Sequence, residues 1–185
     1  LSCSASRESR CQVLRWKGCI GLGEMMNFPG VLGGDRGVLS KIDLARGKVT
    51  DGHAPGVSGK NLSAYIAAGI YSDHESVSLD EAREKLRQGM FVMIREGSSE
   101  KNLDALLPLV TDKTYKRCLF VVDDRSCVDL LRDGDIDGMV RKAIAGGLDP
   151  VRAIQLATIN TAEYFRLDRL GAIAPGYLAN LIVFG

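Results

Sequence analysis

The sequence predicts an α/β fold, namely a partial (β/α)8 barrel of the TIM type that comprises about the last five βα units. From residue 18 onward, short apolar segments alternate with helix-compatible segments, as parallel βαβ units require. Each apolar segment ends at or beside a charged residue or a histidine, and these residues recur every 21 to 29 positions. The C-terminal ends of all strands in such a barrel converge on one mouth, where active sites lie. We therefore expect the strand-end residues to meet.

Five predicted strands each precede a predicted helix. The strands are 18–24, 48–53, 70–74, 90–96 and 117–124, and their end residues are Glu24, His53, His74, Arg95 and Asp123. The helices are 38–47, 58–69, 78–89, 98–110, 126–147 with a break near Gly134, and 148–165. The predicted N-caps are Ser58, Ser78, either Ser98 or Ser99, and Asp149. Ser78 also forms a capping box with Glu81.

The chain divides into three predicted segments. Residues 1–17 are rich in Ser, Arg and Cys, have no clear periodicity and form an atypical N-terminal segment. Residues 18–168 form the partial barrel, and a closed barrel of roughly 250 residues would need about three more βα units upstream. Residues 169–185 read as a strand, a turn at Pro175-Gly176 and a second strand, which we expect to belong to a β-rich second domain.

The composition excludes several classes of partner. With 24 basic and 23 acidic residues the net charge is +1, and no charge block favours nucleic acid or an anionic membrane. The apolar segments are too short to span a membrane. The five cysteines contain no CxxC pair, so we expect reduced thiols and a cytoplasmic protein. An incomplete barrel has unpaired strand edges, and pairing of these edges between two copies of the chain would form a homo-oligomer.

Four of the strand-end residues suit a metal site. Glu24, His53, His74 and Asp123 offer the oxygen and nitrogen ligands that Zn, Mn or Fe(II) accept. Glu24 is of the type that bridges two ions roughly 3.5–4 Å apart, and Asp123 can both bind metal and transfer a proton. Alternatively, Glu24 is an ordinary ion-pair residue and Asp123 an N-cap, with the neighbouring Asp124 as the functional acid. Arg95 is expected to frame the mouth as an ion-pair residue, or alternatively to contact the substrate.

Several motifs resemble the adenine deaminase family of the amidohydrolase superfamily. They are "GLGEMMNFPGVL", "DGHAPGVSGKNLSAYIAAGIYSDHES", "EAREKLRQGMFVMIREGSSEKNLDALLP" and "GAIAPGYLANLIV", and the similarity extends from about residue 18 to the end. The resemblance implies hydrolysis of adenine, a small purine, to hypoxanthine and ammonia by metal-activated water, as in purine salvage. It implies a divalent metal, binuclear in the intact enzyme (Mn, Fe or Zn).

The resemblance also implies a role for each candidate residue. Glu24 corresponds to the bridging carboxylate, His53 and His74 to two metal ligands, and Asp123 to the ligand that shuttles protons. The family's His-x-His pair on the first barrel strand is absent from this chain. Two alternatives therefore stand beside adenine deamination. One is another amidohydrolase activity on cyclic amides, of the dihydroorotase or deacylase kind, and the other is a catalytically inactive fragment.

Overall fold

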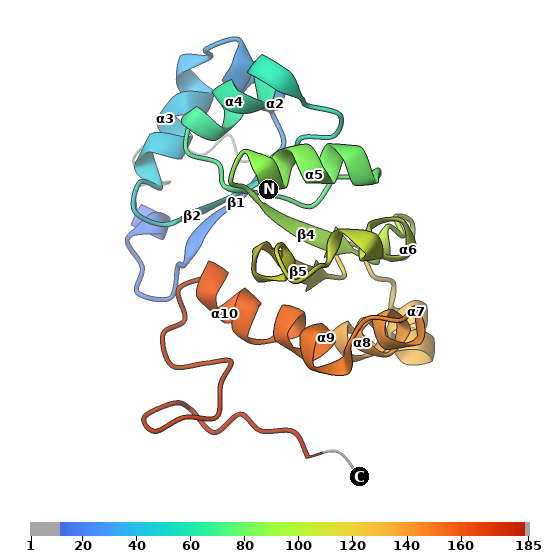
Figure 1. The fold of residues 1–185 in the computed structure, drawn as a ribbon. Coiled ribbons are helices and arrows are strands. Elements are labelled where there is room, and N and C mark those ends of the chain that lie inside the picture. The colour runs from blue at the N-terminus through green and yellow to red at the C-terminus, as the bar shows by residue number, and fades with distance from the viewer. Residues whose placement is uncertain (1–11, 184–185) are drawn as a thin grey trace.

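Five parallel strands follow one another across the fold in chain order (Figure 1). The computed structural model describes residues 12–183. The strands are β1 (Gly21–Met25), β2 (Val49–Gly52), β3 (Ser72–Asp73), β4 (Phe91–Arg95) and β5 (Cys118–Val121). Each lies within one of the five predicted segments or extends it by one residue, so the α/β class and the order of the strands are as predicted.

The strands pair in two groups that lie side by side. β1 pairs with β2, and β3 pairs with β4, which in turn pairs with β5. The two groups meet where the backbone N–H of Tyr71 lies 3.4 Å from the carbonyl oxygen of Thr50. All five strands consequently point their C-terminal ends the same way, and this common end holds the candidate site.

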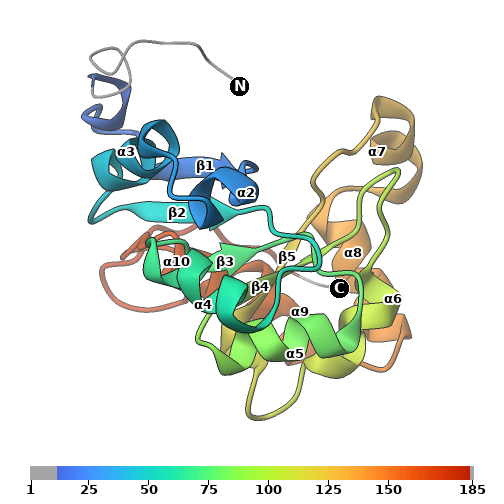
Figure 2. The same ribbon diagram turned by 90° about the horizontal axis from the view of Figure 1, so that it is seen from above.

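Helices occupy the connections and pack outside the strands (Figure 2). They are α2 (Phe28–Leu32), α3 (Arg36–Leu44), α4 (Gly59–Ala67), α5 (Leu79–Arg87), α6 (Leu103–Leu106), α7 (Cys127–Asp133), α8 (Ile136–Ala145), α9 (Pro150–Ala157) and α10 (Ile159–Tyr164), with 3-10 turns η1 (Leu107–Leu109) and η2 (Tyr115–Arg117). Capping explains most boundaries. Ser78 accepts a hydrogen bond from the backbone N–H of Glu81, and Asp149 accepts one from that of Arg152. The predicted break near Gly134 is present, and this residue has a φ of 84°.

Strand residues alternate between two packed faces. Val92 and Ile94 of β4 belong to the cluster formed with the outer helices. Met93 between them belongs instead to a cluster with Val49 of β2, Leu119 of β5 and Tyr164 of α10. This second cluster lies on the face opposite the outer helices, where a barrel places its interior side chains. The alternation therefore explains how a sheet of such short strands is buried on both faces.

The predicted helix over 98–110 is wrong in its start and its length. α6 begins after Asn102 and becomes the 3-10 turn η1, which contains Pro108, a residue without an N–H to continue an α-helix. Ser99 is not an N-cap, because its hydroxyl donates to Asp124 Oδ2 over 2.7 Å. The hydroxyl oxygen of Ser98 accepts the backbone N–H of Ser126 over 2.8 Å. Both serines thus join the loops after β4 and β5.

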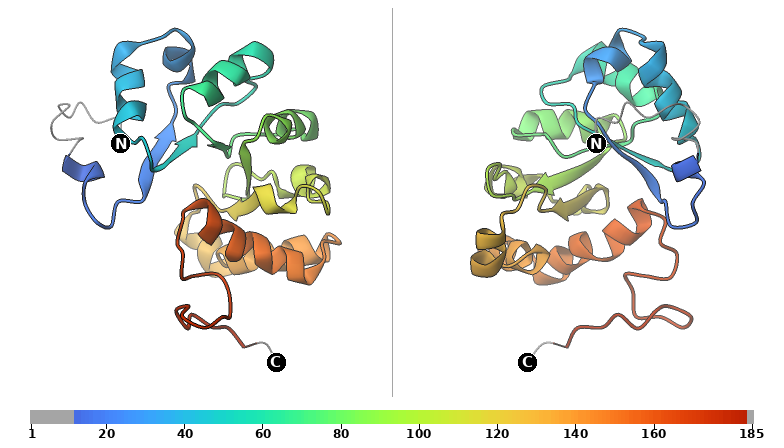
Figure 3. Two further views of the ribbon diagram at one scale, coloured as in Figure 1. Left: turned by 60° about the vertical axis from the view of Figure 1, so that its left-hand side comes forward. Right: turned by 180° about the vertical axis from the view of Figure 1, so that it is seen from behind.

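The two strands predicted in the tail are not formed in the described part of it. The chain leaves α10 as an irregular segment that extends away from the helices (Figure 3). The turn at Pro175 and Gly176 is present, and the backbone N–H of Tyr177 donates to Ala174 O over 3.1 Å. Ile173 is 89% exposed, so this segment has neither a partner strand nor a surface to cover it. Its assignment to a second domain stays a prediction.

None of the helices in the described part of the chain combines the length and the hydrophobicity needed to cross a bilayer.

Candidate metal centre

Three predicted ligands from three neighbouring strands converge at the C-terminal ends. Glu24 lies in β1, His53 directly after β2 and His74 directly after β3. Glu24 Oε2 is 2.9 Å from His53 Nδ1 and 3.0 Å from His74 Nε2. The three potential ligand atoms all lie within 4.8 Å of one another. One carboxylate oxygen and two imidazole nitrogens therefore face a single point.

This donor set fits a divalent transition metal. Ligand bonds of about 2.0–2.2 Å in a tetrahedral site separate the ligand atoms by roughly 3.3–3.6 Å. The two separations between Glu24 and the histidines, 2.9 and 3.0 Å, are slightly shorter, so Glu24 would have to move away from the histidines by a few tenths of an ångström. Imidazole with carboxylate suits Zn, Mn or Fe, whereas an all-oxygen site would indicate Mg or Ca.

Asp51 of β2 fixes the orientation of His74. Its Oδ2 lies 3.3 Å from His74 Nδ1, so the other ring nitrogen, Nε2, faces Glu24. A carboxylate behind a ligating histidine sets the tautomer in many metal sites. Burial by itself lowers the pKa of His74, but hydrogen bonding to Asp51 and the charges of Asp51, Glu24 and Asp73 raise it to about 9. The surrounding carboxylates therefore favour the protonated form of His74.

Glu75 is a further ligand candidate that the sequence patterns did not single out. Its Oε1 is 3.4 Å from His53 Nδ1 and 3.5 Å from His74 Nε2. His74, Glu75 and Asp123 form a second group whose ligand atoms lie within 4.8 Å of one another. His74 belongs to both groups. The arrangement therefore extends from β1 to the loop after β5, with Glu24 at one side and Asp123 at the other.

Asp123, and not Asp124, faces this site. Its Oδ2 lies 3.0 Å from Arg95 Nη1, and its backbone has a positive φ of 54°, uncommon for a residue other than glycine. Asp124 instead accepts the hydroxyl of Ser99 in the neighbouring loop. The left-handed backbone at Asp123 turns the chain so that two consecutive acids point to different places.

Arg95 is buried between carboxylates. It forms a two-pronged ion pair with Glu75, in which Nη2 is 3.2 Å from Oε2, and it also pairs with Asp123. Its Nε donates to Asn102 Oδ1 over 3.3 Å, and Nη2 lies 3.6 Å from Glu100 Oε2. The guanidinium donors are engaged by protein acceptors. Arg95 thus pairs with carboxylates from three different loops at the mouth, as expected of an ion-pair residue.

Tyr65 of α4 links the first two ligand strands from behind. Its hydroxyl donates to Met25 O over 2.9 Å and accepts the backbone N–H of His53 over 3.1 Å. Tyr65 is fully buried, and burial raises the pKa of its hydroxyl, so the group stays protonated as the first hydrogen bond requires. The residue after Glu24 and His53 itself are thereby held together.

Of the residues missed by sequence reasoning, Asp51 left a detectable signal in the strand pattern. Asp51 lies two positions before His53, and residues two apart on a strand share a face. Glu75 directly follows His74, but no period extends into a loop, so only its position beside a candidate ligand could have indicated it.

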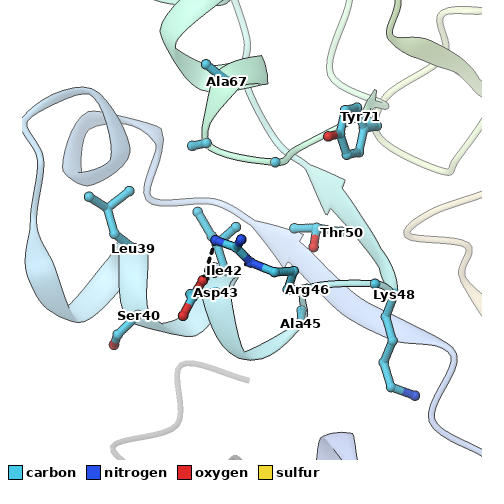
Figure 4. A pocket seen from close by; sticks show the side chains of 13 residues that line it. Leu39, Ser40, Ile42, Asp43, Ala45, Arg46, Lys48, Thr50, Ala67 and Tyr71 are labelled. Atoms are coloured by element: carbon cyan, nitrogen blue, oxygen red, sulfur yellow. Dashed lines mark hydrogen bonds and ion pairs between the residues drawn. The ribbon is translucent and has the colours of Figure 1, made fainter.

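A cavity of about 640 Å³ lies elsewhere, at the N-terminal ends of β2 and β3 (Figure 4). Its lining includes Lys48, Thr50 and Tyr71, and the ion pair of Arg46 with Asp43 stands at its side. None of the candidate ligands contributes to it. Barrel enzymes place their chemistry at the opposite end of the strands.

The parallel strands and the cluster at their C-terminal ends are the architecture of metal-dependent barrel hydrolases. Residues 38–185 match the amidohydrolase family, and the chain belongs to this family. The resemblance to adenine deaminases is confirmed by the relatives. Adenine deaminase from Dehalococcoides mccartyi strain 195 is 75% identical over 93% of this chain. Adenine deaminase 2 from Carboxydothermus hydrogenoformans is 54% identical over 89% of it, and adenine deaminase from Oceanobacillus iheyensis is 52% identical over 89%.

The chain spans about 30% of the length of these relatives. Two crystal structures, one of an amidohydrolase and one of an uncharacterised protein, are similar to this fold with a TM-score of 0.50 each. They are 20% and 16% identical in sequence, and each match covers 76% of this chain and 40% of the other chain. This similarity concerns the fold alone.

Proposed function

We propose that the complete protein containing this chain deaminates adenine to hypoxanthine and ammonia by hydrolysis. The observation that carries this proposal is the convergence of Glu24, His53 and His74 at one end of parallel strands. The 75% identity to an adenine deaminase supports the choice of substrate. Purine metabolism and a cytoplasmic location are the corresponding cellular assignments.

We propose Glu24, His53 and His74 as metal ligands, with Asp123 and Glu75 completing the site from the other side. A divalent metal, for which manganese, iron and zinc are the candidates, would supply an activated water and polarise the substrate. A binuclear centre is supported by the two overlapping groups that share His74. The sequence contains two histidines, so any further imidazole ligand would have to come from outside this chain.

Asp123 is the proposed proton carrier. It is 37% exposed, whereas Arg95 beside it is almost fully buried, so the carboxylate can reach a substrate at the mouth. Deamination of an aminopurine requires a proton to leave the attacking water and one to reach the departing amine. Arg95 holds the carboxylates of Asp123 and Glu75 in place for this transfer, and we propose no direct contact between Arg95 and the base.

The decisive test is an ultraviolet assay of the complete gene product with adenine and with cyclic amides. We expect loss of adenine, formation of hypoxanthine and release of one equivalent of ammonia. The Glu24→Gln variant should lose about 10–100-fold in kcat, because it replaces a charged ligand by a neutral one of the same size. Asp43→Asn, which changes an exposed ion pair near the remote cavity, is the matched control.

Three outcomes separate the alternatives. Turnover of cyclic amides without turnover of adenine would indicate another amidohydrolase activity. Stoichiometric metal without turnover of either substrate would refute the deaminase proposal while leaving the metal site. No metal and no turnover in the complete gene product would indicate a catalytically inactive protein.

A further inference from the structure

Lys85 of α5 is a fully buried lysine whose ammonium contacts the two loops that carry His53 and His74. Its Nζ is 2.7 Å from Asp73 Oδ2, 2.8 Å from Glu81 Oε1, 2.9 Å from the carbonyl oxygen of Ala54 and 3.1 Å from Ser76 Oγ. Lys85 and Asp73 are both 0% exposed. Buried lysines are rare, and an ammonium in such a place needs several acceptors at once.

The acceptors come from the two loops that carry the histidines. Ala54 directly follows His53. Asp73 directly precedes His74, and Ser76 lies two residues beyond it. One ammonium therefore contacts the backbone beside the first histidine and the side chains on both sides of the second.

Asp73, which carries the charge opposite to that of Lys85, also contacts both loops. Its Oδ1 accepts the backbone N–H of Ala54 over 2.8 Å. Its Oδ2 accepts the backbone N–H of Glu75 over 3.1 Å and the hydroxyl of Ser76 over 2.9 Å. The N–H of Ala54 thus donates to Asp73, and its C=O accepts from Lys85.

Such a pair is an inefficient way to stabilise a fold. Two apolar side chains of similar volume often serve stability equally well, because removing two charges from water offsets most of their attraction. An apolar pair, however, could not fix the orientation of the four polar groups in the two loops that contact Lys85 or Asp73, which are the N–H and C=O of Ala54, the N–H of Glu75 and the hydroxyl of Ser76. We propose that Lys85, through Asp73, is a positioning residue that sets the distance between the two histidine loops and thereby the metal affinity.

This inference rests on the proposed metal site. Its test distinguishes a failure of the positioning role from a failure of the metal site itself. The test is a competitive Zn²⁺ titration of the whole chain against a chromophoric chelator, with circular dichroism to show that each variant is folded. Lys85→Met keeps most of the side-chain volume and removes the ammonium. We expect its dissociation constant for Zn²⁺ to rise by about 10–100-fold, the usual effect of losing a group that orients ligands.

Two further variants keep the test decisive. Ser76→Ala removes one contact of Lys85 and one of Asp73 without leaving a buried charge unpaired. We expect its Zn²⁺ affinity to fall several-fold, and this variant provides the test if Lys85→Met does not fold. Lys142→Met is the matched control, because Lys142 pairs with Glu96 over 2.6 Å and Asp104 over 2.9 Å but touches neither histidine loop. It should bind Zn²⁺ like the unmodified protein.

Parental Zn²⁺ affinity in folded Lys85→Met or in Ser76→Ala would overturn the positioning role and leave the metal site intact. A purely structural role would lower the denaturation midpoint of these variants while the dissociation constant stayed unchanged. A failure of the unmodified protein to bind Zn²⁺ would overturn the proposed metal site and the positioning role together.

Discussion

Metal binding at this site should depend steeply on pH, because His74 carries a proton that a metal must displace. The pKa of His74 is raised to about 9 in the metal-free structure, in which hydrogen bonding to Asp51 and three nearby carboxylates overcome the effect of burial. A histidine ligand binds metal only in its neutral form. At pH 7, two units below the pKa, about one His74 side chain in 100 is neutral, which costs about 2.7 kcal/mol of binding free energy.

The apparent Zn²⁺ affinity should therefore rise by about tenfold per unit between pH 7 and pH 9 and then level off. Competitive titration with a chelator of known pH dependence measures this rise. Calorimetry in two buffers with different heats of ionisation should show close to one proton released by His74 at pH 7. The Asp51→Asn variant removes the charge that raises the pKa most, so its affinity should change less with pH over the same interval.

A flat affinity between pH 7 and pH 8 would refute this reasoning, as would an Asp51→Asn profile with the parental slope. Protonation of His74 should also make the stability of the protein without added metal depend on pH. The folded pKa of His74 lies above the unfolded value of about 6.5, so its contribution is fully present below pH 6.5 and is lost as the pH rises to 9. The difference is at most about 3 kcal/mol, and urea denaturation at several pH values measures it.

Two further predictions concern a buried hydroxyl group and the reactivity of two thiols. Tyr65→Phe should lower the free energy of unfolding by about 1–3 kcal/mol, because Met25 O and the N–H of His53 lose their partner while the volume of the ring is kept. Urea denaturation measures this loss, and an unchanged midpoint would contradict the prediction. Cys118 is buried, which raises its thiol pKa to about 12, whereas Cys127 is exposed. A thiol reagent at pH 8 should label Cys127 and spare Cys118, as peptide mass spectrometry would show; equal labelling would contradict the packing.

Local signals predicted most helices and all five strands for physical reasons. Ser78 and Asp149 begin their helices as expected, since a side-chain cap depends on a few neighbouring residues only. The error over 98–110 arose because two serines that look like caps bond to the loop after β5, which is distant in sequence. The error in the tail arose because strand residues form a strand only where another strand supplies hydrogen bonds.

The candidate site was likewise predictable in part. The spacing of Glu24, His53 and His74 was sufficient to predict that they meet, because parallel strands place their ends at one edge. The spacing did not indicate that Glu75 joins them, or that Glu75 and Asp123 are the ion-pair partners of Arg95. Those facts depend on side-chain directions in loops, which follow no period.

The sequence alone determined the alternation of strands and helices, the direction of the strands and the end of the sheet that carries the histidines. Hydrophobic periodicity and turn residues encode these properties locally. Only the tertiary structure showed that Asp123, and not Asp124, lies beside His74 and Glu75, that Asp51 pairs with His74 and that Lys85 contacts both histidine loops. The reason is that a charged group in a buried place is oriented by partners from distant segments, and their positions exist only once the chain has folded.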